Sequence, residues 1–428
     1  MKVSKSVCQN GESSWTLGAR WVFPIDGQPL EHGTLTLRGG RILAVEPCGS
    51  RTPDTDIGNA ALVPGFANAH THLDLSGLRN KTPPRADFTD WLRAVIQHRR
   101  SQTREQIQKD IEHGLAESLA SGTTLLGDIA AQGLSWPALC GAPLRSVVFY
   151  ELLGLPRARA HQAWAAACAW VRQHRPTSAC RPGLSTHAPY SVRTSLFRAA
   201  ASLAQQYHLP LATHLAESFA ELRLLTQQQG PFVTFLKDLG VWDSEGLVDK
   251  PETVIDLHAK ASAALFVHAN YLHPSTTIPQ GATVVYCPRT HAAFGHKPHP
   301  FCEFLAAGVR VALGTDSLAS NPDLSVLNEA RYLHEEFPDL SGEAILRMAT
   351  LSGAEALGWQ DETGSLAVGK SADFTVLKLP NTDAGNPHDL IFSAAAAVDQ
   401  VYIRGEKVYQ ADATAAAARL RTPSRRQP

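Results

Sequence analysis

Residues 62–72 read LVPGFANAHTH, an apolar run that leads into two histidines separated by one residue. On a β-strand, His70 and His72 would point to the same face, where both imidazoles can bind one cation. A His-x-His pair is a weak signal alone, because two such residues also occur on ordinary half-buried strands. Its meaning depends on whether similar strand ends recur along the chain.

Four further segments end an apolar, β-branched run in a metal-binding or acid/base residue. They read LATHLAE (211–217), LFVHAN (265–270), VVYCPRTH (284–291) and VALGTDS (311–317). The residues that they add to the pair are His214, Glu217, His268, His291 and Asp316. This recurrence predicts one metal site assembled from the ends of several strands.

Segments typical of strands and of helices alternate through the middle of the chain. Eight strand candidates begin near residues 62, 123, 145, 183, 209, 264, 282 and 309. Residues 103–121 open with the capping-box pattern Thr103-x-x-Gln106, and Asn321-Pro322 and Ser341 are predicted to start two later helices. Eight strands over about 300 residues indicate an α/β fold, a (β/α)₈ TIM barrel, with its chemistry at the C-terminal strand ends.

The segments before and after the predicted barrel both contain short strand candidates joined by tight turns. LTLRGGRILAV (35–45) predicts a hairpin around Gly39-Gly40, and VDQVYIRGEKVYQ (398–410) predicts another around residues 404–406. Neither segment is long enough to bury a core alone. We therefore expect a composite β-sandwich of residues 1–63 and 363–410, a hydrolase barrel over 64–362 and a flexible tail over 411–428.

Composition excludes several classes of function. The chain has 39 Lys and Arg against 40 Asp and Glu, a formal net charge of −1, so no broad basic surface for nucleic acid or anionic membrane is indicated. No apolar run of membrane-spanning length and no signal-peptide pattern is found, which predicts a cytoplasmic protein acting on a small molecule. The seven scattered cysteines form no C-x-x-C pair, which argues against disulfides and a thiolate zinc site.

Three imidazoles and one carboxylate around a divalent ion, with one position left for water, are typical of a catalytic metal site. Such an ion lowers the pKa of its water towards ~7 and supplies hydroxide at neutral pH. Glu217, three residues after His214, is placed to move the proton. Asp316 can bind the ion and orient the water, and His268 can hold the developing charge. Since no lysine follows the fourth strand to bridge two ions, one metal is expected.

The role of the remaining polar residues near strand ends stays open between two alternatives. Each can contact substrate, or can pack a strand end and cap a loop. These residues are His187, Arg289 and His291. Likewise, the FTDWL segment (88–92) either covers the site with Phe88 and Trp91 or is an ordinary helix that docks on the barrel.

The chain resembles the amidohydrolase superfamily, in the branch that contains cytosine, guanine and S-adenosylhomocysteine deaminases and the triazine chlorohydrolases. The strings that carry the resemblance are PGFANAHTHLDLSGL (64–78), THLAES (213–218), VHANYL (267–272) and LGTDSLASNPDL (313–324). It implies a (β/α)₈ barrel with a composite β-sandwich and one divalent metal, zinc or alternatively iron. The implied ligands are His70, His72, His214 and Asp316. The implied catalytic groups are Glu217 as proton shuttle, with His268 and Asp316 supporting the water.

Within that branch, STHAPYSV (185–192), FYELLGLP (149–156) and CPRTHAAFGHKPHPF (287–301) are similar to the aminodeoxyfutalosine deaminase-like group. This similarity implies deamination of an adenine ring at a non-peptide C–N bond, with His187, Arg289 and His291 contacting the substrate. Two positions depart from the group: Asp74 replaces Glu, and Ala293 replaces an aromatic residue whose loss would reshape the pocket.

Two kinds of alternative accompany this expectation. The same metal site would serve an amidase, an amidine hydrolase or a chlorohydrolase acting on another ring. A non-catalytic barrel scaffold is the alternative of a different class, although it would be expected to have lost ligands that this chain retains. Because related barrels commonly dimerise, the resemblance also allows a homodimer.

Overall fold

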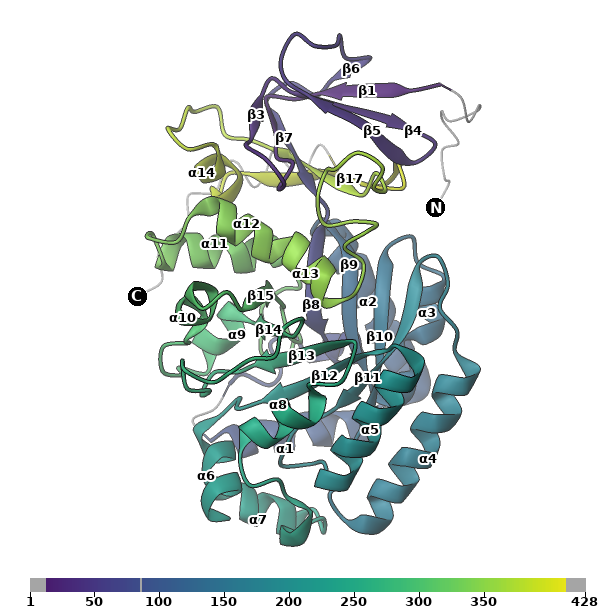
Figure 1. Cartoon of the computed structure of the whole chain (residues 1–428), viewed down its shortest axis with the longest axis vertical. Coiled ribbons are helices and arrows are strands. Elements are labelled where there is room, and N and C mark those ends of the chain that lie inside the picture. The colour runs from purple at the N-terminus through teal and green to yellow at the C-terminus, as the bar shows by residue number, and fades with distance from the viewer. Residues whose placement is uncertain (1–12, 85–86, 413–428) are drawn as a thin grey trace.

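Eight parallel strands form a barrel that occupies the lower part of the computed structural model, which describes residues 13–84 and 87–412 (Figure 1). Neighbouring strands follow chain order from β8 to β15. Their bounds are Phe66–Thr71 (β8), Thr123–Ala130 (β9), Arg145–Leu152 (β10), Cys180–Thr186 (β11), Pro210–Leu215 (β12), Ala263–His268 (β13), Thr283–Tyr286 (β14) and Arg310–Leu313 (β15). The predicted (β/α)₈ fold is confirmed, and each predicted strand is present.

The barrel closes where the first strand meets the segment after the last. The backbone N–H groups of Thr315 and Asp316 both donate to the His70 carbonyl, at 3.1 Å. The buried Asn68 side chain accepts from the Thr315 N–H at 3.1 Å and donates to its hydroxyl at 2.7 Å. We call this set of contacts the β8–β15 seam. It brings the first and last parts of the predicted metal site together.

The segment predicted as one strand over 62–70 is in fact two strands in different sheets. β7 (Ala60–Pro64) pairs with β16 (Phe374–Lys378) of the β-domain, and β8 begins two residues later in the barrel. Between them, a Cβ on Gly65 would lie 2.0 Å from the Thr124 hydroxyl, so no larger residue fits at this crossing. We propose that the domain boundary, predicted between residues 63 and 64, lies at this crossing, between the end of β7 and the start of β8.

Strands from both termini form the β-domain at the top of Figure 1. One sheet has the order β5-β4-β1-β6 and the other β18-β17-β16-β7-β2-β3. Their remaining bounds are Trp15–Gly18 (β1), Trp21–Val22 (β2), Leu30–Glu31 (β3), Thr34–Arg38 (β4), Arg41–Glu46 (β5), Thr55–Asp56 (β6), Ala397–Ile403 (β17) and Glu406–Gln410 (β18). Leu35 of one sheet and Val376 of the other belong to one buried cluster. The composite β-domain is therefore confirmed.

The two predicted hairpins touch each other in this domain. Gly39 and Gly40 link β4 to β5, and Arg404 and Gly405 link β17 to β18, all with positive φ. A Cβ on Gly40 would lie 2.7 Å from the Arg404 carbonyl oxygen. The glycine thus lets turns from opposite ends of the chain pack against one another.

Two of the three predicted helix starts are confirmed. Thr103 caps α2 (Arg104–Ala120), with both bonds of the capping box to Gln106 present. Ser341 caps α12 (Gly342–Ala349). The third prediction is wrong, because α11 (Val326–Glu336) begins after Ser325, whose hydroxyl accepts from the Asn328 N–H. The Asn321 side chain instead donates to the Thr315 carbonyl at 2.8 Å, beside the seam.

The remaining helices surround the barrel or join it to the β-domain. They are α1 (Phe88–Ser101), α3 (Trp136–Cys140), α4 (Arg157–Gln173), α5 (Thr194–Tyr207), α6 (Phe219–Gln227), α7 (Pro231–Asp238), α8 (Pro251–His258), α9 (Pro288–Ala293), α10 (Phe301–Ala306), α13 (Leu351–Ala356) and α14 (Pro387–Phe392). Among the described residues, none of the helices combines the length and apolarity needed to cross a bilayer. Most of the predicted tail, from residue 413 on, lies outside the described residues.

Candidate metal centre

Side chains from three separate strand ends meet in one buried cluster at the C-terminal end of the barrel. His72 Nε2 lies 3.2 Å from His214 Nε2. Asp316 Oδ1 lies 3.5 Å from His70 Nε2 and 3.8 Å from His72 Nε2. The structure therefore brings together the four residues predicted to bind the metal.

The hydrogen bonding of these imidazoles fits a bound cation. His214 Nδ1 donates to the His187 carbonyl at 2.8 Å, so its Nε2 carries a lone pair that points at His72. Both ring nitrogens of His70 and Nδ1 of His72 are buried without a hydrogen-bond partner among the described residues. Unpartnered buried nitrogens are costly in a folded protein, and a divalent cation removes that cost at Nε2. The cluster is thus a buried, histidine-rich metal site.

The protonation states suit the same interpretation. Burial lowers the pKa of His72 well below its usual range and that of His214 to about 3, which leaves both rings neutral. Neutral imidazole is the form that binds metals. Burial opposes ionisation of Asp316, but the adjacent imidazoles of His70, His268 and His72 hold its pKa below the usual range. Asp316 Oδ2 accepts from Ser320 at 2.7 Å, which leaves Oδ1 facing the histidines.

Glu217 and His268 lie beside this cluster. His268 Nε2 is 3.4 Å from Glu217 Oε1. The Glu221 carboxylate accepts from the backbone N–H groups of Ala216 at 2.8 Å and of Glu217 at 3.1 Å, and Asn270 donates to the Glu217 carbonyl at 2.9 Å. Burial and then the charges of nearby carboxylates raise the pKa of Glu217 well above its usual range. Glu221 was not predicted from the sequence, although it lies only four residues after Glu217.

Four non-glycine residues at these strand ends adopt left-handed backbone conformations. Ala216, His268, Ala269 and Asp316 have φ of 50°, 67°, 56° and 56°. Such conformations cost free energy and persist where the surrounding contacts enforce them, often at active sites. Here they turn the chain at the points where Glu217, His268 and Asp316 reach the cluster.

A cavity of about 300 Å³ opens beside the cluster. Polar groups on one side include His187, Glu217 and His268. Much of the remaining lining is apolar and includes Trp91, Leu92, Val95 and Ile96 from α1 and Phe235, Leu236, Leu239 and Val241 from or just after α7. Such a cavity suits a small molecule with one polar reacting end and an apolar extension.

The FTDWL segment was predicted either to cover the site or to form a helix that docks on the barrel, and it does part of both. It forms the start of α1, which docks against the barrel, and Trp91 lines the cavity. The Phe88 ring packs against Trp91 at a centroid distance of 5.4 Å but does not line the cavity.

Residues 61–408 match the amidohydrolase family over most of the chain. This chain belongs to the amidohydrolase family. It is 30% identical to an aminodeoxyfutalosine deaminase from Nitratiruptor sp., over 82% of this chain and 87% of that protein. It is also 30% identical to a 5-methylthioadenosine/S-adenosylhomocysteine deaminase from Nitratidesulfovibrio vulgaris, over 89% and 88%. The crystal structure of a Xanthomonas campestris adenosine deaminase with bound zinc is 25% identical, with a TM-score of 0.76 and coverage of 95% and 97%.

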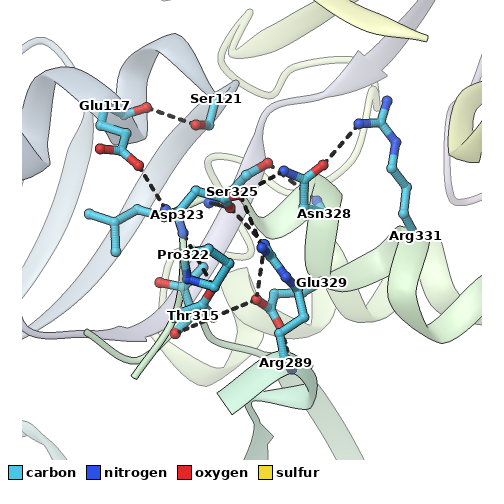
Figure 2. A network of polar contacts seen from close by, with 12 residues as sticks. Glu117, Ser121, Arg289, Thr315, Pro322, Asp323, Ser325, Asn328, Glu329 and Arg331 are labelled. Carbon is cyan, nitrogen blue, oxygen red and sulfur yellow. Dashed lines mark hydrogen bonds and ion pairs between the residues drawn. The ribbon is translucent and has the colours of Figure 1, made fainter. Parts of the chain in front are cut away.

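Two predicted substrate contacts of this amidohydrolase do not reach the cavity. The Arg289 guanidinium pairs with Asp323 through two bonds of 2.7 and 3.1 Å, and its backbone N–H donates to Glu329 (Figure 2). The His291 ring lies 2.9 Å from the Lys297 carbonyl oxygen. Ala293 is exposed and lies outside the cavity wall, so the loss of an aromatic ring there does not reshape this pocket. Of the three predicted contacts, only His187 lines the cavity.

The cavity of the amidohydrolase also contains an ion cluster that the sequence analysis missed. Arg99 of α1 lies 2.9 Å from Asp74 and 3.6 Å from Glu151, at the end of β10. Both Arg99 and Glu151 line the cavity. Asp74 was noted only as a departure from the family pattern, and no local pattern marks Arg99.

Proposed function

We propose that this amidohydrolase deaminates an adenine-type nucleoside that carries an extension on its sugar, using one divalent metal ion, zinc or alternatively iron. The observation that carries the proposal is the buried His/Asp cluster beside Glu217, next to a cavity whose lining is largely apolar. Two relatives that match most of the chain support the choice of substrate, because both names describe deaminases, one of an S-adenosyl or methylthioadenosine compound and one of aminodeoxyfutalosine.

His70, His72, His214 and Asp316 would hold the ion. A divalent ion there supplies one kind of chemistry, a lowered pKa of about 7 for a bound water. The zinc in the Xanthomonas campestris structure supports zinc as the first choice.

Glu217 is proposed to carry protons during the reaction. Water adds to the carbon that bears the amino group, and Glu217 moves one proton of that water to the adjacent ring nitrogen. The second proton passes from the added hydroxyl to the amino group, which leaves as ammonia as the C–N bond breaks and the carbonyl forms. His268, 3.4 Å from Glu217, can donate a hydrogen bond to the oxygen being added. The bonds from Asn270 and to Glu221 hold Glu217 in place for both transfers.

His187 is proposed as a contact to the substrate ring. Its Nδ1 lies 2.6 Å from the Ser191 hydroxyl oxygen. This contact fixes the orientation of the ring and leaves Nε2 for the proposed contact to the substrate. Its place on the cavity wall next to His214, at a ring-centroid distance of 5.2 Å, puts it near the reacting end of the substrate.

The test is release of ammonia by the metal-loaded protein. We would compare adenine, adenosine, methylthioadenosine, S-adenosylhomocysteine, aminodeoxyfutalosine, guanine and cytosine by kcat/KM. A 5′-extended adenosine should be the best substrate and free adenine a far poorer one, because remote binding energy orients the reacting carbon.

Other outcomes point to the alternatives. If guanine or cytosine is best, the adenine-nucleoside assignment is wrong. Chloride release from a chlorotriazine, without ammonia from any nucleoside, supports the chlorohydrolase alternative. A protein that binds no metal and turns over no compound supports the non-catalytic scaffold.

A further inference from the structure

We infer that the Glu151 carboxylate, backed by Arg99, accepts the hydrogen bonds of the substrate's sugar hydroxyls and so reads the sugar diol. This inference rests on the proposed function, because it requires a nucleoside in the cavity. It assigns a binding role to a residue that takes no part in the metal site or in proton transfer.

The strand register places Glu151 on the same side of the barrel wall as the reacting groups. Glu151 is paired with Ser185 on β11, which is paired with Ala212 on β12. Because side chains alternate along a strand, His187 and His214, each two residues farther on, share that face. Two strand spacings of about 4.8 Å separate Glu151 from the strand of His214. A nucleoside with its base at the metal end can span that separation with its sugar.

Glu151 is an acceptor without a donor. Its side chain is 1% exposed, and neither carboxylate oxygen has a hydrogen-bond partner among the described residues. The nearest charge is Arg99, whose Nη1 lies 3.6 Å away, beyond hydrogen-bond distance. Arg99 is held instead by Asp74, through contacts of 2.9 and 3.2 Å. A buried carboxylate in this state gains from any O–H or N–H donor that enters the cavity.

The charges around Glu151 favour neutral donors. Arg99 compensates part of its charge, and Arg100 and Arg159 also line the cavity. These guanidinium groups would repel an ammonium group, whereas they would not repel a neutral pair of hydroxyls. Two adjacent hydroxyls also match the two free oxygens of one carboxylate in number and direction. The sugar diol of a nucleoside is therefore the ligand chemistry that fits.

The experiment compares adenosine, 2′-deoxyadenosine, 3′-deoxyadenosine and S-adenosylhomocysteine in the metal-loaded wild type, in Glu151→Gln and in Glu335→Gln. Glu335 is exposed on α11 and serves as the matched control. Loss of a hydrogen bond to a charged group should lower kcat/KM of the wild type about 10- to 100-fold for each missing hydroxyl. In Glu151→Gln, adenosine should fall by a similar factor and the preference for it over the deoxy compounds should shrink to a few-fold. Glu335→Gln should behave like the wild type.

Several results would overturn the inference. A wild type that deaminates both deoxy compounds as well as adenosine does not read the diol, although the proposed function stands. A Glu151→Gln variant that keeps the full preference shows that another group reads it. A variant impaired only on S-adenosylhomocysteine shows that Glu151 binds an ammonium group instead. If the wild type deaminates no adenine nucleoside at all, the proposed function fails and this inference fails with it.

Folding of the variant is checked by circular dichroism and thermal melting. Should Glu151→Gln not fold, Glu151→Asp keeps the charge beside Arg99 and withdraws the oxygens by one methylene. It is then expected to lower kcat/KM for adenosine and to reduce the preference for the diol. A Glu151→Asp variant with an unchanged preference would overturn the inference.

Discussion

The carbonyl oxygen of His187 lies 2.8 Å from Nδ1 of His214, so the main chain at the end of β11 orients an imidazole at the end of β12. This contact requires a proton on Nδ1 and leaves the lone pair on Nε2. The backbone at the end of β11 therefore fixes the tautomer of His214 in which Nε2 can bind a metal ion.

Alanine substitution of each proposed ligand should remove metal and activity together, because each variant lacks one side chain that would bind the ion directly. The four variants are His70→Ala, His72→Ala, His214→Ala and Asp316→Ala. Elemental analysis and ammonia release measure both quantities on the same samples. His161→Ala, at an exposed position of α4, is the control and should keep its metal. A variant with full metal occupancy and normal turnover would remove that residue from the site.

Glu217→Gln should keep the metal and lose most of its turnover. The amide preserves the shape of the side chain but cannot carry the proton, and such groups typically contribute ~10²–10⁴-fold. His268→Asn should behave in the same way. Metal content and kcat are measured side by side, with Glu335→Gln as control. Near-normal kcat in Glu217→Gln would mean that the proton takes another route.

Glu221 should act as a positioning residue for Glu217. Glu221→Gln keeps one oxygen to accept one of the two backbone bonds, and Glu221→Ala keeps neither. We expect kcat to fall in the order wild type, Gln, Ala, while KM and metal content change little. An equal loss of kcat and metal in both variants would instead indicate that the whole loop has collapsed.

Asn68→Ala should loosen the β8–β15 seam. It removes the three hydrogen bonds of the Asn68 side chain, which join it to the Thr315 N–H, the Thr315 hydroxyl and the His70 N–H, and this should cost about 1–3 kcal/mol of unfolding free energy. Urea denaturation of the metal-free protein measures this loss. In a double-mutant cycle, Thr315→Val should add little to Asn68→Ala, because both remove the same contact. Additive losses would show that the two side chains do not act together.

His258 should make the folded state less stable in acid. Burial lowers its pKa to about 3, whereas the unfolded chain has the ordinary value of 6.5. Between these values the unfolded chain takes up a proton that the folded protein excludes, so stability is lost as pH falls from 6.5 towards 3. The slope is at most about 1.4 kcal/mol per pH unit. His258→Gln, which keeps a polar group near Thr186, should flatten this part of the curve in urea titrations at several pH values. An unchanged slope would contradict the prediction.

The positions of the strands and of the metal-binding residues could be predicted because both depend on local order. A His-x-His pair on a strand has only one geometry, and parallel strands in a barrel bring their C-terminal ends together. Histidines and an aspartate that follow apolar runs therefore have to meet. Their backbone conformations, such as the positive φ of Asp316, could not be read from the residue types.

Other contacts depend on how one element is rotated against another. Arg289 follows β14 by only a few residues, but it belongs to α9, and its side chain pairs with Asp323 instead of lining the cavity. Asn321 precedes a proline as a helix cap would, yet the Thr315 carbonyl competes for its side chain. Arg99 and Glu151 belong to elements with no shared sequence pattern, so their meeting follows only from the docking of α1.

The β8–β15 seam also sets an order of events during synthesis. Asn68 and Thr315 are 247 residues apart, so the histidines of the first strand leave the ribosome long before their carboxylate partner exists. Until residue 316 has emerged and the last strand has docked, the nascent chain offers an incomplete set of ligands. The complete set of proposed ligands can therefore form only late in synthesis, and a chain interrupted before that point retains only part of the site.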